Sequence, residues 1–124
     1  MLVRHLNEVP SVDWGNGVSR RFLLASDGMN YTVTDTIVLA GTKSRLEYRS
    51  HLESCYCIEG SGEVVDLAGN SYPLTPGTLY ALNDHDPHFL IASPDVDLRL
   101  VCVFSPALRG DEVHSLDAAE FSAY

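Results

Sequence analysis

The chain lacks the features of membrane and secreted proteins. None of its apolar runs approaches the roughly 20 residues that a membrane-spanning helix needs, and the N-terminal stretch MLVRHLNEVP is polar by its fifth residue, which argues against a secretory signal. The cysteines are only three, an odd number, and they lie in apolar, strand-like segments at Cys55, Cys57 and Cys102. We therefore expect reduced thiols in a cytoplasmic protein rather than a disulfide framework.

Basic residues are also scarce. Among 124 residues there are 8 Lys and Arg against 17 Asp and Glu, a formal net charge of −9, whereas a nucleic-acid-binding protein normally carries the opposite balance. Hydrophobic residues make up 45% of the chain and charged residues 20%, which is ordinary for a globular protein. The length predicts one domain over residues 1–124, with 1–19 and 105–124 as flanking segments or a lid.

Short runs of β-branched and apolar residues, separated by Gly or Pro turns, recur along the chain. The segment WGNGVS (14–19) has the composition of a loop, and the tail from residue 105 has no clear period, with at most a short helix near 116–120. Many short strands at a spacing of about 8–12 residues predict an all-β barrel or jelly roll with little helix. The expected strands are 2–5, 20–25, 31–40, 46–49, 53–58, 63–67, 78–82, 88–92 and 98–104.

Two motifs resemble the paired signatures of the cupin superfamily of small β-barrels. They are E-x-x-Y-x-I-E-G at 53–60 and P-G-x-x-Y at 76–80. Cupins usually bind a metal through two His and one Glu of the first signature and one His of the second. Here Glu47 and Arg49 stand at the His-x-His positions and Tyr80 at the second His position. The usual metal cage is therefore absent from the sequence.

A different donor set is available in the same segments. Glu53, Tyr80 and His88 offer a carboxylate, a phenol and an imidazole, which suit iron and related divalent metals. Alternate residues of a strand share a face, so Cys55 and Cys57 should point inward with Glu53. Tyr80 and His88 flank a short connection, and we expect them near the mouth of adjacent antiparallel strands.

Longer stretches are similar to the ectoine synthase family of cupin-fold cyclodehydratases. They include SRRFLLASDGM (19–29), HLESCYCIEGSGE (51–63), YPLTPGTLYALNDHDPHFL (72–90) and LRLVCVFSPAL (98–108). The resemblance implies a cytoplasmic homodimer that makes the compatible solute ectoine during osmotic stress. The implied reaction closes N-γ-acetyl-L-2,4-diaminobutyrate to a cyclic amidine with loss of water.

The resemblance also implies the roles of individual residues. Iron(II), or another divalent metal, falls on Glu53, Tyr80 and His88. Catalytic and substrate-binding roles fall on seven further residues, with Tyr48 and Glu112 as a possible acid/base pair. These are Tyr48, Glu112 and His114 for catalysis and Arg21, Thr36, Cys102 and Phe104 for substrate binding.

Two departures from the family leave other functions open. Gly17 stands where the family usually has a pocket tryptophan, with Trp14 three residues away, and Glu47 stands where an aromatic residue is common. They favour a family relative that acts on another N-acyl diamino acid or in the hydrolytic direction. An oxidative role like that of cupin dioxygenases is a third alternative. A fourth is a small-molecule binder without catalysis, because a fold does not fix a function.

Overall fold

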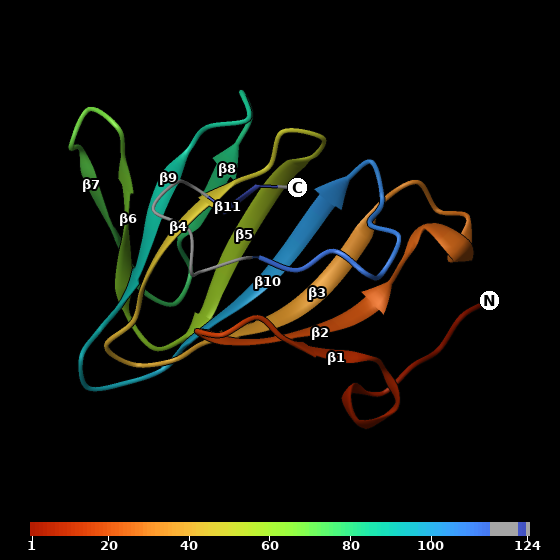
Figure 1. Cartoon of the computed structure of the whole chain (residues 1–124). Coiled ribbons are helices and arrows are strands. Elements are labelled where there is room, and N and C mark those ends of the chain that lie inside the picture. Colours follow the sequence, from red (N-terminus) through yellow and green to blue (C-terminus); the bar gives the residue numbers. More distant parts are fainter. Residues whose placement is uncertain (115–121, 124) are drawn as a thin grey trace.

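Two β-sheets make up the described part of the chain, residues 1–114 and 122–123 of a computed structural model (Figure 1). The first sheet has six strands in the order β1 (Ser11–Asp13), β2 (Gly17–Leu23), β3 (Thr32–Val38), β10 (Leu98–Ser105), β5 (Leu52–Glu59) and β8 (Leu79–Leu82). The second has five, in the order β11 (Ser122–Ala123), β4 (Lys43–Glu47), β9 (His88–Ala92), β6 (Gly62–Asp66) and β7 (Ser71–Leu74). All pairs are antiparallel except β11 with β4.

The described residues contain two 3-10 turns, η1 (Leu6–Glu8) and η2 (Ala25–Asp27), and no α-helix. The prediction of an all-β fold with little helix is thus confirmed. No helix in the described ranges is long and apolar enough to cross a membrane. The helix expected near 116–120 lies outside the residues described.

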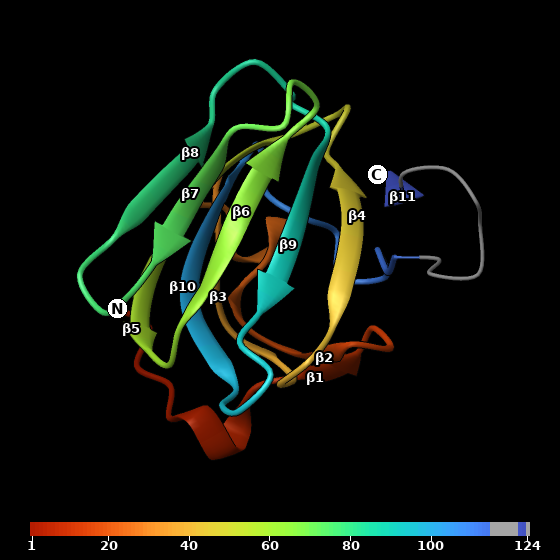
Figure 2. The same cartoon turned by 90° about the vertical axis from the view of Figure 1, so that its left-hand side faces the viewer.

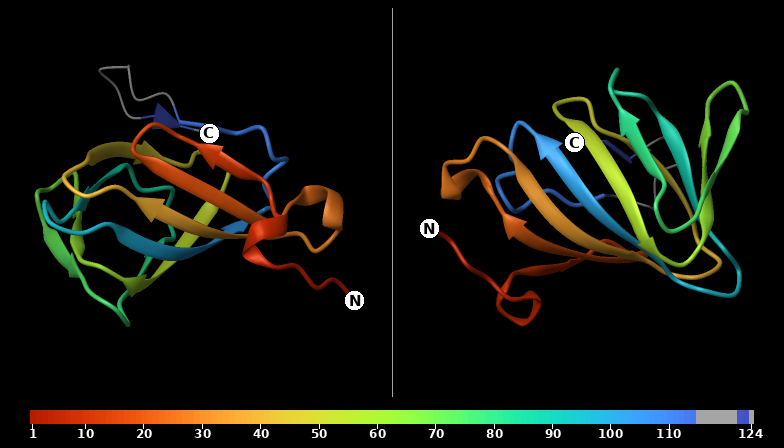
Figure 3. Two further views of the ribbon diagram at one scale, coloured as in Figure 1. Left: turned by 90° about the horizontal axis from the view of Figure 1, so that it is seen from below. Right: turned by 180° about the vertical axis from the view of Figure 1, so that it is seen from behind.

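The inner faces of the two sheets enclose the core. In Figure 2 the strands β4, β9 and β6 lie in front of β3 and β10, and Figure 3 shows the same layers from below and from behind. The alternation along β10 explains this packing, because Leu98, Leu100, Cys102 and Phe104 are buried while the residues between them are more exposed. The facing side of the second sheet is formed by the buried side chains of Leu46, Val64, Leu74 and Leu90.

Several strand predictions need correction. Residues 2–5 form no strand, while β1 and β7 were not predicted. Only residues 14–16 of the expected loop 14–19 form a turn, since residues 17–19 already belong to β2 and pair with β3. Tyr80 and His88 do not lie on adjacent strands: β8 pairs with β5, whereas β9 pairs with β4 and β6 of the other sheet. The connection between them crosses the barrel mouth from one sheet to the other.

The chain after β10 turns back along the first sheet. The Leu108 N–H donates to the Thr32 hydroxyl at 2.8 Å, and the Leu108 carbonyl accepts from the Ala25 N–H at 2.7 Å. Leu108 is fully buried. These contacts bring residues 109–114 to the cavity between the sheets.

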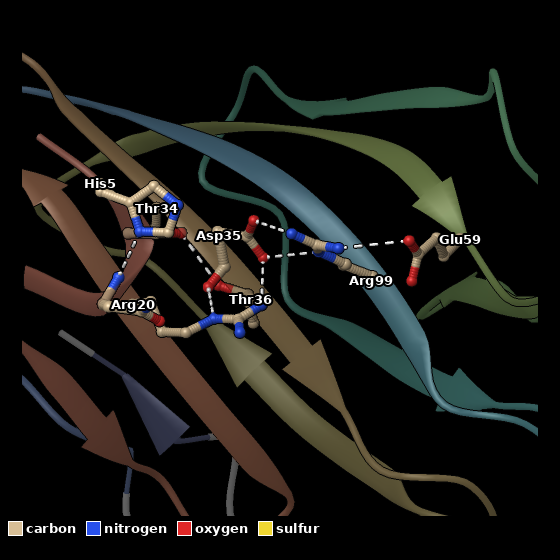
Figure 4. A network of polar contacts seen from close by, with 8 residues as sticks. His5, Arg20, Thr34, Asp35, Thr36, Glu59 and Arg99 are labelled. Carbon is tan, nitrogen blue, oxygen red and sulfur yellow. Dashed lines mark hydrogen bonds and ion pairs between the residues drawn. The ribbon is translucent and has the colours of Figure 1, made fainter. Parts of the chain in front are cut away.

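An ion network fastens the outer face of the first sheet (Figure 4). The Asp35 carboxylate accepts from Nε and Nη2 of Arg99 at 3.0 and 2.7 Å, and from Nη2 of Arg20 at 2.5 Å. Arg99 also reaches Glu59 on β5 at 3.2 Å. Partial burial raises the pKa of Asp35, but the two guanidinium groups outweigh it and hold the pKa below its ordinary value. Four strands are thereby linked by charge.

Candidate active site

A row of side chains crosses the inner face of the first sheet. Strand register places Arg21 opposite Thr34, Thr34 opposite Cys102, Cys102 opposite Cys55, and Cys55 opposite Tyr80. The five residues come from β2, β3, β10, β5 and β8, and four of them line one cavity between the sheets. The sheet thus aligns polar groups that are far apart in sequence.

The cavity is closed on its other sides by residues from different elements. Leu46 and Leu90 come from the second sheet, and Val113 and His114 from the C-terminal segment. Its free volume is about 40 Å³, room for a few water molecules but not for an amino-acid derivative. A substrate is therefore admitted only if lining side chains move. Val113 and His114 belong to no strand.

Glu53 on β5 lines the cavity, with 6% of its surface exposed. Burial raises the pKa of its carboxyl group to about 8, although hydrogen bonds from the Cys55 and Cys102 thiols act in the opposite direction. Ligand atoms of Glu53, Cys55 and Cys102 all lie within 4.8 Å of one another. A carboxyl group this strongly desolvated would ionise readily beside a bound cation.

The connection that precedes β9 orients the His88 ring. Its Nδ1 lies 2.9 Å from the Asp86 carbonyl oxygen and therefore donates to it, which leaves the lone pair on Nε2. Nε2 is buried and has no hydrogen-bond partner among the described residues. Burial lowers the pKa of His88, so the ring is neutral. The rings of His88 and Tyr80 lie 6.2 Å apart between centroids.

Two candidate donor sets include Glu53. The sequence predicts Tyr80 and His88 as its partners, whereas the structure groups Glu53 with the thiols of Cys55 and Cys102, which offer softer sulfur ligands. Burial raises the pKa of the Tyr80 phenol well above its ordinary range, and burial together with Cys102 and Glu53 does the same for Cys55. The alternation along β5 predicts that Cys55 points into the barrel, and it is buried there. That Cys55 stands opposite Cys102 of β10 cannot be predicted from the sequence.

Tyr48 and His114 form a direct pair. The Tyr48 hydroxyl lies 3.0 Å from Nε2 of His114, and both side chains are buried. The Tyr48 ring also packs edge-on against Phe104, with centroids 5.2 Å apart. A phenol bonded to an imidazole can pass a proton in either direction, so this pair suits acid/base chemistry.

The Glu112 side chain hydrogen-bonds to the backbone in this structure. Its carboxylate accepts from the N–H groups of Arg109 and Gly110 at 2.8 and 2.9 Å. Arg21 donates from Nη1 and Nη2 to the carbonyls of Gly110 and Glu112 at 2.9 and 2.5 Å. Partial burial raises the pKa of Glu112, but the backbone N–H groups outweigh it and keep the pKa below its ordinary value. The Tyr48 hydroxyl contacts His114, whereas the Glu112 carboxylate binds backbone N–H groups.

The cavity brings together most of the residues that the sequence singled out. His88 and Glu112 are the predicted site residues outside its lining, while Ser19, Cys55 and Trp14 are lining residues without a predicted role. Those in the lining are Arg21, Thr36, Tyr48, Glu53, Tyr80, Cys102, Phe104 and His114.

The sequence model of the ectoine synthase family matches residues 1–122. The chain belongs to the ectoine synthase family. It is 47% identical to the L-ectoine synthase of Desulfatibacillum aliphaticivorans, over 96% of this chain and 95% of the relative. It is therefore classed with the hydro-lyases of ectoine biosynthesis.

Solved structures agree with the ectoine synthase assignment. The crystal structure of ectoine synthase from P. lautus superposes with a TM-score of 0.84 at 44% identity, over 89% of this chain and 81% of that one. A polyketide cyclase from Streptomyces resistomycificus, 19% identical, superposes with a TM-score of 0.73 over 94% and 89% of the two chains. At that identity the likeness shows only the fold, and these neighbours confirm the predicted cupin barrel.

Proposed function

We propose that this member of the ectoine synthase family closes N-γ-acetyl-L-2,4-diaminobutyrate to ectoine, with the cavity as its active site. The observation that carries the proposal is the Tyr48–His114 hydrogen bond inside a cavity lined by Arg21, Thr36 and Phe104. These side chains come from three strands of the first sheet, from the β4–β5 connection and from the C-terminal segment. Their convergence supports one joint role in binding and proton transfer.

The reaction requires controlled proton movement. The α-amine attacks the acetamide carbonyl carbon, the new C–N bond becomes part of the amidine, and the former carbonyl oxygen departs as water. The amine nitrogen loses two protons overall, and the oxygen gains them. The Tyr48 hydroxyl, bonded to His114, can deliver a proton to the departing oxygen while His114 accepts one from the amine. Burial of both groups keeps bulk water from the reverse reaction.

Iron(II) is the proposed cofactor, held by Glu53, Tyr80 and His88. The unpartnered Nε2 of His88 and the desolvated carboxyl of Glu53 support the fit. Such a cation would polarise the amide carbonyl as a Lewis acid. Glu53 and His88 therefore serve as ligands here, while Tyr48 and His114 remain available to move protons.

The remaining predicted residues hold the substrate or the lid. Thr36, Cys102 and Phe104 line the cavity and would contact the substrate. Arg21 and Glu112 are tied to the backbone of residues 109–112, so we assign them the positioning of the segment that carries His114. This revises the acid/base role first suggested for Glu112.

Turnover of the acetylated diamino acid tests the proposal. Protein loaded with ferrous iron under reducing conditions is incubated with N-γ-acetyl-diaminobutyrate, and mass spectrometry follows the formation of a product lighter by one water. The N-α-acetyl isomer is the matched substrate control, and we expect no comparable turnover of it. Absence of the dehydrated product, or equal use of both isomers, would overturn the proposed reaction. Hydrolysis of added ectoine under the same conditions would favour the reverse direction instead.

We further propose a cytoplasmic homodimer of single-domain subunits. An outward-facing apolar patch on β5, β8 and β10 supports pairing through the first sheet: Leu52, Tyr56, Leu79 and Val103 are 42%, 44%, 58% and 39% exposed. Tyr56 and Leu79 are direct cross-strand neighbours. Sedimentation of the 13.6 kDa chain and of a Tyr56→Arg variant tests this. A wild-type monomer, or a variant that remains dimeric, would contradict it.

A further inference from the structure

Trp14 is the only tryptophan of the chain, and it closes the turn between β1 and β2. Its backbone N–H donates to the Gly17 carbonyl at 3.1 Å. The turn folds the indole back over the sheet, where it lines the cavity with 8% of its surface exposed. A residue that precedes β2 thus supplies part of the cavity wall.

Gly17 makes room for this indole. A Cβ at position 17 would lie 1.8 Å from the Ile37 carbonyl oxygen and 3.2 Å from Cζ2 of Trp14. Real Cβ atoms essentially never approach a backbone atom to less than 3.0 Å, so position 17 admits no side chain in this sheet. The Ile37 backbone and the Trp14 indole both lie against Gly17.

The indole N–H is left without a partner. Nε1 of Trp14 is buried and makes no hydrogen bond within the described residues. Other polar groups of the cavity are engaged: Arg21 donates to two carbonyls, Thr36 pairs with Thr34 at 2.9 Å, and Tyr48 pairs with His114. A buried donor without an acceptor costs about 1–3 kcal/mol. An acceptor brought by a ligand would remove that cost.

We propose that Nε1–H of Trp14 donates a hydrogen bond to the α-carboxylate of the substrate and thereby sets the preference for an amino acid over a simple diamine. The proposal rests on the proposed function. Nη1 and Nη2 of Arg21, the guanidinium nitrogens at the same cavity, already donate to backbone carbonyls, so a neutral indole donor is the group in the described lining that lacks an acceptor. The carboxylate is not altered by the reaction, so this bond acts equally on substrate and product.

The direct test uses the single indole of the wild-type protein. A ¹⁵N–¹H spectrum contains one indole cross-peak, and saturating ectoine should move it downfield, as expected for a new charge-assisted hydrogen bond. The matching amidine without the carboxylate, 2-methyl-1,4,5,6-tetrahydropyrimidine, should leave the peak close to its free position. An indole peak unmoved by saturating ectoine, or moved equally by both ligands, would overturn the proposal.

Kinetics of a Trp14→Phe variant give a second, independent readout. Hydrogen bonds to charged groups contribute about 1.5–3 kcal/mol, so the KM for N-γ-acetyl-diaminobutyrate should rise roughly 10-fold to 100-fold. The value of kcat should change by less than about threefold, because the bond is uniform between ground and transition states. The matched control is Tyr72→Phe, on a residue 53% exposed on β7, which should behave as wild type.

A carboxylate-free substrate separates hydrogen bonding from packing. For N-acetyl-1,3-diaminopropane, Trp14→Phe should change kcat/KM little, whereas an equal loss with both substrates would show that the indole acts only by filling space. Should the wild-type enzyme turn over neither compound, the proposed function fails. The indole peak with ectoine would then still decide the role of Trp14, so the two failures are distinguishable.

Discussion

Cys55 and Cys102 stand directly opposite one another on β5 and β10, and both thiols hydrogen-bond to the Glu53 carboxyl group. This arrangement keeps a buried acidic side chain beside two thiols that donate to it. With the metal ligands proposed above, a proton and a metal ion would compete for the Glu53 carboxyl group, and stability would depend on both pH and metal content.

Glu53→Gln should make the metal-free protein more stable at alkaline pH. The folded pKa of Glu53 is about 8 against an ordinary value of 4.5, so between these values the folded state binds a proton that the unfolded state does not. The free energy of unfolding of the wild type therefore falls as pH rises through this window. At 1.36 kcal/mol per pKa unit the penalty has an upper bound of about 5 kcal/mol.

Urea unfolding of the metal-free wild type and of Glu53→Gln between pH 5 and pH 9 measures this effect. We expect the free energies of unfolding of the two proteins to diverge as pH rises, with the higher value for Glu53→Gln. Glu63→Gln on β6 serves as the matched control. Parallel curves would show that Glu53 is already ionised in the folded protein. Iron(II) should remove the divergence by stabilising the wild type alone.

Removal of His88 should abolish iron binding. Nε2 of His88 has no partner among the described residues, and a ligand lost from a three-residue set lowers metal affinity steeply. We expect His88→Ala to purify with at least 10-fold less iron than wild type, measured by elemental analysis. His5→Ala, at an exposed residue before η1, is the control for loss of a histidine and should retain iron. Full iron content in His88→Ala would exclude the proposed ligand set.

Cys55→Ala distinguishes the two donor sets that share Glu53. If iron is held by Glu53, Tyr80 and His88, the variant keeps its iron, and cobalt(II) bound to wild type gives no thiolate-to-metal charge-transfer absorption in the near ultraviolet. We expect both results for iron and cobalt. For softer cadmium, we expect thiolate absorption in wild type and none in Cys55→Ala, because Cys55 and Cys102 provide sulfur donors within 4.8 Å. Thiolate absorption with cobalt would instead assign the physiological metal to the cysteines.

Much of the fold is predictable from sequence because the barrel has strict alternation. Both boundaries of β9 are predicted correctly. The inward face of β5 follows from the period of two along Glu53, Cys55 and Cys57. β7 was missed because Ser71–Leu74 contains Pro73 and leaves only its last residue buried. A strand on the sheet edge carries little hydrophobic signal.

The site is less predictable, because it depends on pairing between distant strands. Sequence similarity names the residues, yet it cannot show that Tyr80 and His88 come from different sheets or that Cys102 faces Cys55. It also suggests an acid/base role for Glu112, whose carboxylate is engaged by two backbone N–H groups. From the sequence, Gly17 in place of the family's tryptophan indicates the loss of a pocket residue. The turn geometry at Trp14 shows how the pocket wall is retained.

Tyr48 and His114 should act as a unit in catalysis. Tyr48→Phe and His114→Ala each remove one side of a 3.0 Å hydrogen bond, and each should lower kcat about 10²-fold to 10⁴-fold. The kcat of the double variant should be only slightly lower than that of the less active single variant, because either change already breaks the proton path. Steady-state kinetics with iron-loaded protein measures this, with Tyr72→Phe as control. Fully multiplicative losses would mean that the two residues act independently.

Asp35→Asn should destabilise the sheet in a pH-dependent manner. Asp35 is paired with Arg20 and Arg99, whose side chains are 21% and 26% exposed, so solvent screening reduces the loss to about 1–3 kcal/mol. Its folded pKa lies below the ordinary 3.8, so the stabilisation is present above that pH and is lost as pH falls through the folded value. Urea unfolding at pH 7 should separate wild type from Asp35→Asn, and the gap should narrow toward pH 2. Asp95→Asn, at an exposed loop residue, should match wild type throughout. A stability gap that persists undiminished at pH 2 would contradict the prediction, because it would show that the loss does not come from the charge of Asp35.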